Sequence, residues 1–270
     1  MLPPLAHRGS VRPGTGEVTV ARGLYYGCDR NRGHCMQQVK ALLFDVFGTL
    51  VDWRTSIARE ARALLLPQGV NVDWEAFADA WRDQYQPAMD EVRSGRLPFS
   101  RLDALHRRNL DVVLKEFGLA HIGEPARKEL NLAWHRLDAW PDVSLGLARL
   151  RTKFRVAPCS NGNVSLMADL ARRNGFYWDA ILGAEIARDY KPKPVVYLAS
   201  AAAFDCEPGE AMMVAAHSGD LAAAAACGLR TAFIARPDEK GPGKGERQAT
   251  VPVDLAADGL LQLADRLGCA

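Results

Sequence analysis

The run at residues 39–44, which is apolar without a break from Ala41 to Phe44 and is followed directly by Asp45, is the feature that most limits what this chain can fold into. A strand with one face in water would alternate apolar and polar residues, whereas an unbroken run indicates a strand buried on both faces of a parallel sheet. Such a strand delivers Asp45 to its carboxyl end, where open α/β sheets place their ligands. Gly48 allows a sharp turn there, and Thr49 can form a hydrogen bond next to the carboxylate. The sequence therefore predicts an α/β fold with an acidic site after its first strand.

From Pro141 onward, short apolar runs alternate with amphipathic stretches. Such alternation predicts a parallel sheet with helices on both faces. The strands expected after the first one are 154–159, 180–182, 211–216 and 231–235. The helices expected between and after them are 164–174, 194–204, 219–227 and 253–267.

The segment 54–140 separates the first strand from the next one and has a different pattern. Its apolar residues recur every three or four positions, as at Leu110, Val113, Leu114 and Phe117, which is the spacing of an amphipathic helix. We therefore expect an inserted helical region, with helices at 56–66, 74–85, 100–117 and 125–137.

The charge distribution gives no reason to expect a polyanionic partner. The net charge is +2; residues 1–35 contain five arginines and two acidic residues, and the rest of the chain contains 29 basic and 30 acidic residues. No apolar stretch approaches the roughly 20 residues of a membrane-spanning helix. We expect neither a nucleic-acid partner nor a membrane; the oligomeric state is not fixed, and a homodimer stays open.

Residues 1–35 are rich in Gly, Pro and Arg and have no apolar periodicity, which predicts a disordered leader. Met36 directly precedes the first strand, so translation from Met36 is an alternative in which the leader does not belong to the native protein. Six cysteines are scattered along the chain without a preceding secretory signal, so we interpret them as reduced thiols and expect a cytoplasmic protein.

Residues 44–50 read Phe-Asp-Val-Phe-Gly-Thr-Leu and resemble the first motif of the haloacid dehalogenase (HAD) superfamily. Most members are magnesium phosphatases with Asp-x-Asp here, whose second Asp protonates the leaving alkoxide. Phe47 stands at that position and can donate no proton. A halide leaving group needs none, so the resemblance points to the type II (S)-2-haloacid dehalogenase branch, which has an aromatic residue here. It implies a HAD-like Rossmannoid parallel-sheet core, residues 36–53 and 141–270, with an inserted helical cap at 54–140.

Substrate-binding residues are also implied by the resemblance. Ser160 and Asn161 follow an expected strand; Ser-Asn-Gly alone is a common turn and helix cap, but the matching pair in the family binds the substrate carboxylate. Arg82 matches a cap arginine that accepts the departing halide, whereas its residue type alone fits a solvated helix face equally well. We assign Thr49, beside the nucleophile, to the same substrate-binding set.

Lys191 is followed by Pro192 at the point where the family has a Lys-Pro, whose lysine steadies the nucleophilic carboxylate. Taken without the resemblance, Lys191 would be an exposed loop lysine. Tyr197 lies six residues further on, at the spacing where these dehalogenases carry a functional tyrosine, and we place it in the substrate-binding set. Periodicity alone would make Tyr197 a core residue.

Residues 214–220 occupy the place of a phosphatase motif with two aspartates, the first of which binds Mg²⁺. Ala216 replaces that first aspartate, and only Asp220 is retained. Because Mg²⁺ depends on carboxylate ligands, this loss predicts an enzyme without metal or other cofactor. His217 stands where familiar dehalogenases have Asn, so a catalytic role and a structural role both stay open.

The activity implied by the resemblance is hydrolytic dehalogenation of short 2-haloalkanoic acids, including haloacetates such as fluoroacetate, to 2-hydroxy acids. Asp45 would attack the halogen-bearing carbon and form an ester. Lys191, Asp220 and His217 would then assist the hydrolysis of that ester. The alternatives are a HAD-type phosphatase with altered motifs and a non-catalytic protein that binds small anions on the same fold.

We predict that residues 1–35 are dispensable, because they have no apolar face that could pack on the body. A protein that starts at Met36 should keep the melting temperature and the turnover rate of the full chain, measured side by side. A large loss of either quantity would show that the leader contributes to the folded protein.

Overall fold

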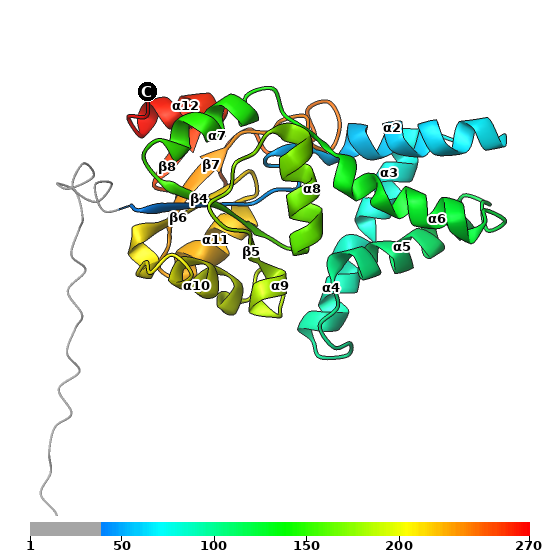
Figure 1. Cartoon of the computed structure of the whole chain (residues 1–270), viewed down its shortest axis with the longest axis horizontal. Coiled ribbons are helices and arrows are strands. Elements are labelled where there is room, and N and C mark those ends of the chain that lie inside the picture. The colour runs from blue at the N-terminus through cyan, green and yellow to red at the C-terminus, as the bar shows by residue number, and fades with distance from the viewer. Residues whose placement is uncertain (1–38) are drawn as a thin grey trace, which may run out of the picture.

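The computed structural model describes residues 39–270, so the predicted leader and the alternative start at Met36 lie outside the described residues. Six strands form one parallel sheet in the order β5-β4-β1-β6-β7-β8 (Figure 1). They are β1 (Ala41–Phe44), β4 (Arg155–Ser160), β5 (Leu182–Gly183), β6 (Ala211–Ala215), β7 (Arg230–Ile234) and β8 (Leu255–Ala257). The predicted α/β class is confirmed. The strand order reverses at β1, so the residues after β1 lie at the switch point of the sheet, where α/β folds bind ligands.

Alternate side chains of β1 enter two separate apolar cores. Leu42 and Phe44 belong to a core that includes α7 (Val143–Arg151), α8 (Val164–Asn174) and α12 (Leu260–Arg266). Ala41 and Leu43 belong to the other core, with α10 (Pro194–Ala202) and α11 (Ser218–Ala226). Figure 1 shows α7 and α12 above the sheet and α10 and α11 below it. Both faces of β1 are covered, which is why its sequence is apolar without interruption.

Between β1 and β4 the chain forms a group of helices beside the sheet (Figure 1): α2 (Trp53–Leu65), α3 (Trp74–Asp83), α4 (Tyr85–Arg93), α5 (Leu102–Glu116) and α6 (Glu124–Asn131). The chain enters and leaves this group through two short antiparallel strands, β2 (Val51–Asp52) and β3 (Asp138–Ala139). Helix α2 begins where the Asp52 side chain accepts the backbone N–H of Thr55 at 3.1 Å. The division into core and cap at residues 54 and 141 stays a prediction.

Several predicted helices differ from those in the structure. Helices α4 and α7 and the short α9 (Ala184–Ala187) are absent from the predicted set. In α4, Pro87 lies in the first turn, where a backbone N–H has no partner within the helix, so this proline does not break it. The predicted helix 125–137 ends at Asn131 and continues as a 3₁₀ turn, Leu132–Arg136. No helix within residues 39–270 has both the length and the apolar character needed to cross a bilayer.

The predicted helix 253–267 is wrong over its first part. There, β8 extends the sheet by pairing with β7, and helix α12 begins only at Leu260. The start of β8 is fixed by Asp254, whose carboxylate accepts the backbone N–H of Thr231 at 2.8 Å. A strand of three residues is too short to show the alternation of apolar and polar residues that identifies a strand. Because helix α12 follows almost at once, the apolar residues of β8 and α12 together look like one longer helix.

Trp134 joins the helical group to the loop after β1, and its truncation should destabilise the protein. Its ring is fully buried, with the ring centroids of Phe47 at 5.9 Å, Trp81 at 5.5 Å and His106 at 4.2 Å. Trp134→Ala should lower the free energy of unfolding by about 3–5 kcal/mol, the usual cost of removing a buried aromatic ring. Tyr177→Ala, at a side chain 70% exposed, is the control and should change it by less than about 0.5 kcal/mol. Denaturant titrations that give both variants the same free energy of unfolding would contradict this role of Trp134.

Candidate active site

A cavity of about 1040 Å³ lies at the carboxyl ends of the parallel strands, between the sheet and the helical group. Segments that follow the strands supply Asp45, Asn161 and His217 to its lining. The helical group supplies Trp53, Arg82 and Tyr85. Motifs that are far apart in the sequence therefore meet in one place.

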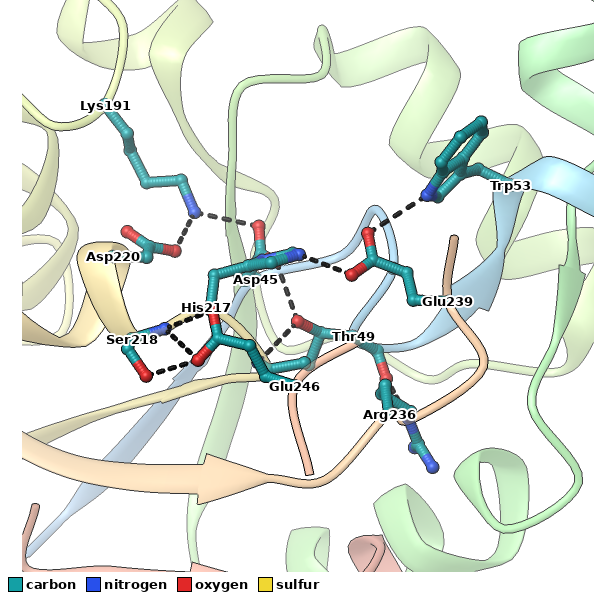
Figure 2. A network of polar contacts seen from close by, with 12 residues as sticks. Asp45, Thr49, Trp53, Lys191, His217, Ser218, Asp220, Arg236, Glu239 and Glu246 are labelled. Carbon is teal, nitrogen blue, oxygen red and sulfur yellow. Dashed lines mark hydrogen bonds and ion pairs between the residues drawn. The ribbon is translucent and has the colours of Figure 1, made fainter. Parts of the chain in front are cut away.

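Asp45 is held by three side chains (Figure 2). Its Oδ1 accepts a hydrogen bond from Nζ of Lys191 at 2.9 Å; its Oδ2 accepts the Thr49 hydroxyl at 2.7 Å and lies 3.0 Å from Nδ1 of His217. The Thr49 hydroxyl is itself fixed, because it accepts the backbone N–H of Ala216 at 2.9 Å. Burial disfavours a charged carboxylate, but the Lys191 ammonium and the His217 imidazole outweigh it and hold the pKa of Asp45 well below its usual range. Asp45 is therefore ionised at neutral pH.

Lys191 bridges two carboxylates and is fixed along its whole length. Its Nζ donates to Asp45 and, at 2.5 Å, to Oδ2 of Asp220. Its backbone N–H donates a hydrogen bond to Oδ1 of Asn161 at 2.8 Å. Its backbone carbonyl accepts a hydrogen bond from Nη1 of Arg93, on α4, at 2.6 Å. Burial alone would lower the pKa of Lys191, but the charges of Asp220 and Asp45 raise it well above its ordinary value. The bridge is thus a permanent cation between two anions.

Asp220 is positioned from two further directions. Its Oδ1 accepts the hydroxyl of the buried Tyr197 at 2.5 Å, so this hydroxyl is already occupied by a protein group. Burial and the charge of Asp220 raise the pKa of Tyr197 far above its usual value. The first turn of α11, which carries Asp220, is capped by Glu246, which accepts the backbone N–H of Ser218 at 3.2 Å (Figure 2).

Glu239 is a functional candidate that the motifs did not reveal. It lies in the loop after β7; its Oε2 is 3.0 Å from Nε2 of His217, and its Oε1 accepts the indole N–H of Trp53 at 3.0 Å (Figure 2). Gly48 makes room for it, because Gly48 has φ 84° and a Cβ there would lie 2.2 Å from Oε1 of Glu239. The only available signal was its place shortly after a parallel strand, at the same edge of the sheet as Asp45.

His217 lies between two carboxylates and carries a positive charge. Burial favours the neutral ring, but hydrogen bonds and charge interactions with Asp45 and Glu239 outweigh it and raise the pKa of His217 to about 10. Despite its own burial, the pKa of Glu239 is lowered in return. Any event that neutralises Asp45 would remove one of the two anions that keep His217 protonated.

Arg82, from α3, faces the same cavity with part of its guanidinium unpaired. Its Nη1 is buried and has no hydrogen-bond partner among the described residues. Its Cζ lies 4.0 Å from the ring centroid of Tyr85, 5.4 Å from that of Trp53 and 5.9 Å from that of Phe47. A cation with a free N–H in an aromatic surrounding is suited to a small, weakly hydrated anion.

The two residues predicted to bind the substrate carboxylate are placed differently. Asn161 lines the cavity, and its carbonyl oxygen binds the backbone of Lys191. Ser160 is fully buried and absent from the cavity lining, and its hydroxyl accepts the backbone N–H of Gly162 at 3.0 Å. In the structure, the Ser160 hydroxyl therefore stabilises the turn that follows β4. Thr49 is likewise fully buried and contacts the nucleophile rather than the open cavity.

Comparisons with known proteins agree with this geometry. A family model described as haloacid dehalogenase-like hydrolase matches residues 39–228. The (S)-2-haloacid dehalogenase 1 of Pseudomonas sp. (strain CBS-3) is 28% identical over 205 residues, which cover 74% of this chain and 86% of that protein.

Two solved structures are more similar in sequence. A defluorinating L-2-haloacid dehalogenase is 46% identical, with a TM-score of 0.83 and coverage of 86% of this chain and 96% of that one. Another L-2-haloacid dehalogenase is also 46% identical, with a TM-score of 0.82 and coverage of 85% and 99%. The chain therefore belongs to the haloacid dehalogenase-like hydrolases, in the branch of the (S)-2-haloacid dehalogenases.

Proposed function

We propose that this protein hydrolyses the carbon–halogen bond of short 2-haloalkanoic acids and releases halide and a 2-hydroxy acid. The observation that carries the proposal is the pair formed by Asp45 and Arg82, an ionised carboxylate and a partly unpaired cation that face one cavity. Phe47, two residues after the carboxylate, offers no proton to a leaving group. This arrangement supports displacement of an anion that leaves without protonation, as a halide does.

In the first step, Asp45 is the nucleophile. Its Oδ1 accepts one protein hydrogen bond and Oδ2 takes part in two, so Oδ1 has the free lone pair that can reach a substrate. A bond forms from Oδ1 to the α-carbon as the bond from that carbon to the halogen breaks, and the electron pair leaves with the halide toward Arg82. Asn161, which lines the cavity, would contact the substrate carboxylate.

In the second step, water attacks the carbonyl carbon of the Asp45 ester, the ester bond breaks, and Asp45 is restored. Ester formation removes the negative charge of Asp45, so the pKa of His217 falls below its starting value of about 10. His217 can then lose its proton and act as the base for the attacking water, while Glu239 holds its Nε2. The second hydrogen of the water passes from the tetrahedral intermediate to the leaving alkoxide, which becomes the 2-hydroxy acid, and Asp45 leaves as a carboxylate. His217 keeps the proton that it takes from water, so the proton released to solvent is the one that His217 lost after ester formation.

The substrate range of this proposal includes haloacetates and fluoroacetate. Support comes from the 46% identical solved enzyme, which is described as defluorinating, and from the free N–H that Arg82 could donate to fluoride. We also infer a cytoplasmic location, which is supported by the free thiols of the cysteines within residues 39–270: Cys159, Cys206, Cys227 and Cys269. No particular contact in the site favours a phosphatase or a non-catalytic anion binder.

The reaction itself is tested by halide release. The protein should release chloride from chloroacetate and 2-chloropropionate at the same rate with and without EDTA, because neither Phe47 nor Ala216 can supply a metal-binding carboxylate. Asp45→Asn should release none, since an amide is a poor nucleophile. Phosphate release from phosphomonoesters that depends on Mg²⁺ would favour the phosphatase, and tight haloacid binding without turnover would favour the anion binder.

The role of His217 is tested by the pH dependence of ester hydrolysis and by the mass of the intact protein. Because the pKa of His217 falls when Asp45 is esterified, hydrolysis of the ester should accelerate as the pH rises, with a midpoint below about 10. His217→Asn should remove this rise and slow turnover by about 100-fold or more, the usual contribution of a general base. The trapped ester should appear as added mass on the intact protein. His121→Asn, at an exposed loop histidine, is the matched control; a pH profile of His217→Asn that matches it would contradict the role.

A further inference from the structure

Trp53 touches both charged groups on which the two chemical steps depend. It is the first residue of α2, it is only 2% exposed, and it lines the cavity. Its indole N–H donates to Oε1 of Glu239 at 3.0 Å, while its ring lies 5.4 Å from Cζ of Arg82. Figure 2 shows the indole N–H aimed at the Glu239 carboxylate from the side opposite His217.

Arg82 and Glu239 carry opposite charges near one another, yet they do not pair. The charge of Arg82 is close enough to help lower the pKa of Glu239. Nevertheless, Glu239 binds His217 and Trp53, and Nη1 of Arg82 is without a hydrogen-bond partner among the described residues. A buried polar group without a hydrogen-bond partner is costly, so an arginine that keeps an N–H free beside a carboxylate needs a structural reason.

The indole of Trp53 has the contacts needed to keep these two groups apart. Its N–H occupies the Glu239 oxygen that does not bind His217. Its ring, together with the ring of Tyr85 at 4.0 Å, covers the Arg82 guanidinium with aromatic faces. Cation–π contacts stabilise the charge of an arginine without using its N–H groups, so they leave Arg82 able to donate.

We propose that Trp53 is a positioning residue that prevents Arg82 and Glu239 from forming an ion pair, so that Arg82 stays free for the departing halide and Glu239 stays bound to His217. The proposal rests on the proposed dehalogenase function. It assigns two separable tasks to one side chain: the N–H serves ester hydrolysis through Glu239, and the ring serves halide departure through Arg82.

Two substitutions separate these tasks. Trp53→Phe keeps an aromatic ring beside Arg82 but removes the N–H, so the halide burst of a single turnover should stay within about threefold of wild type. Ester hydrolysis should slow by about tenfold or more, in line with the loss of a hydrogen bond to a charged group, and the Asp45 ester should accumulate. Trp53→Leu removes the N–H and the ring, so the halide burst itself should slow by about tenfold, and little ester should accumulate.

A double substitution tests the cause directly. If an ion pair between Arg82 and Glu239 forms in Trp53→Leu, adding Glu239→Gln abolishes it, and the halide burst should recover most of its rate while ester hydrolysis stays slow. A burst that stays slow in the double variant would overturn the proposal. A Trp53→Phe enzyme with wild-type ester hydrolysis would overturn it as well, and this variant decides the question if Trp53→Leu does not fold.

Trp81→Phe is the matched control, because it also removes a buried indole N–H, which here donates to the carbonyl of His106 at 3.0 Å, away from Glu239. It should lower the melting temperature by an amount similar to Trp53→Phe without trapping the ester. If the wild-type protein released no halide from any 2-haloacid, the proposed function would fail. If the wild type turned over and Trp53→Phe behaved like Trp81→Phe, only the assignment of Trp53 would fail.

Discussion

The ammonium of Lys191, placed between Asp45 and Asp220, is the contact on which the rest of the site depends. Two buried carboxylates that share a site raise the pKa of one another unless a cation separates them. Lys191 reaches both, at 2.9 and 2.5 Å, and so keeps the nucleophile ionised. The cation is held in place by both parts of the molecule, because its backbone binds Asn161 after β4 and Arg93 on α4.

The same principle extends to the neighbouring charges. Asp45, Asp220 and Glu239 carry three negative charges, Lys191 and His217 carry two positive charges, and Arg82 brings the sum to zero. Buried charges are tolerated when they are paired, so the position of each group depends on the others. A change of charge at Asp45 during the reaction therefore changes the proton affinity of His217 without any movement of the backbone.

Much of the fold and part of the site could be predicted from sequence, and the particular residues explain why. Asp45, Asn161 and His217 each follow a buried strand of a parallel sheet, so their side chains had to meet at one edge. The uninterrupted apolar run of β1 and the three- and four-residue spacing in α5 specify their structures locally. Glu239 lies in a loop without periodicity, and its place after β7 does not by itself assign it a role, whereas its contacts with His217 and Trp53 do. From sequence alone, the hydroxyl of Ser160 is as compatible with a turn as with a binding site. Short elements such as β8 contain too few residues to show the alternation of apolar and polar residues typical of a strand.

Phe47 limits which side chains this position of the site can hold. Its ring is 2% exposed and packs edge-on against Tyr85, His106 and Trp134, with Arg82 5.9 Å away. An aspartate at this position would be buried among aromatic rings beside Arg82, and pairing with Arg82 would remove the free anion-binding group. Phe47 is thus part of the packing between the sheet and the helices. An acid introduced here would therefore disturb the aromatic packing and occupy Arg82 at the same time.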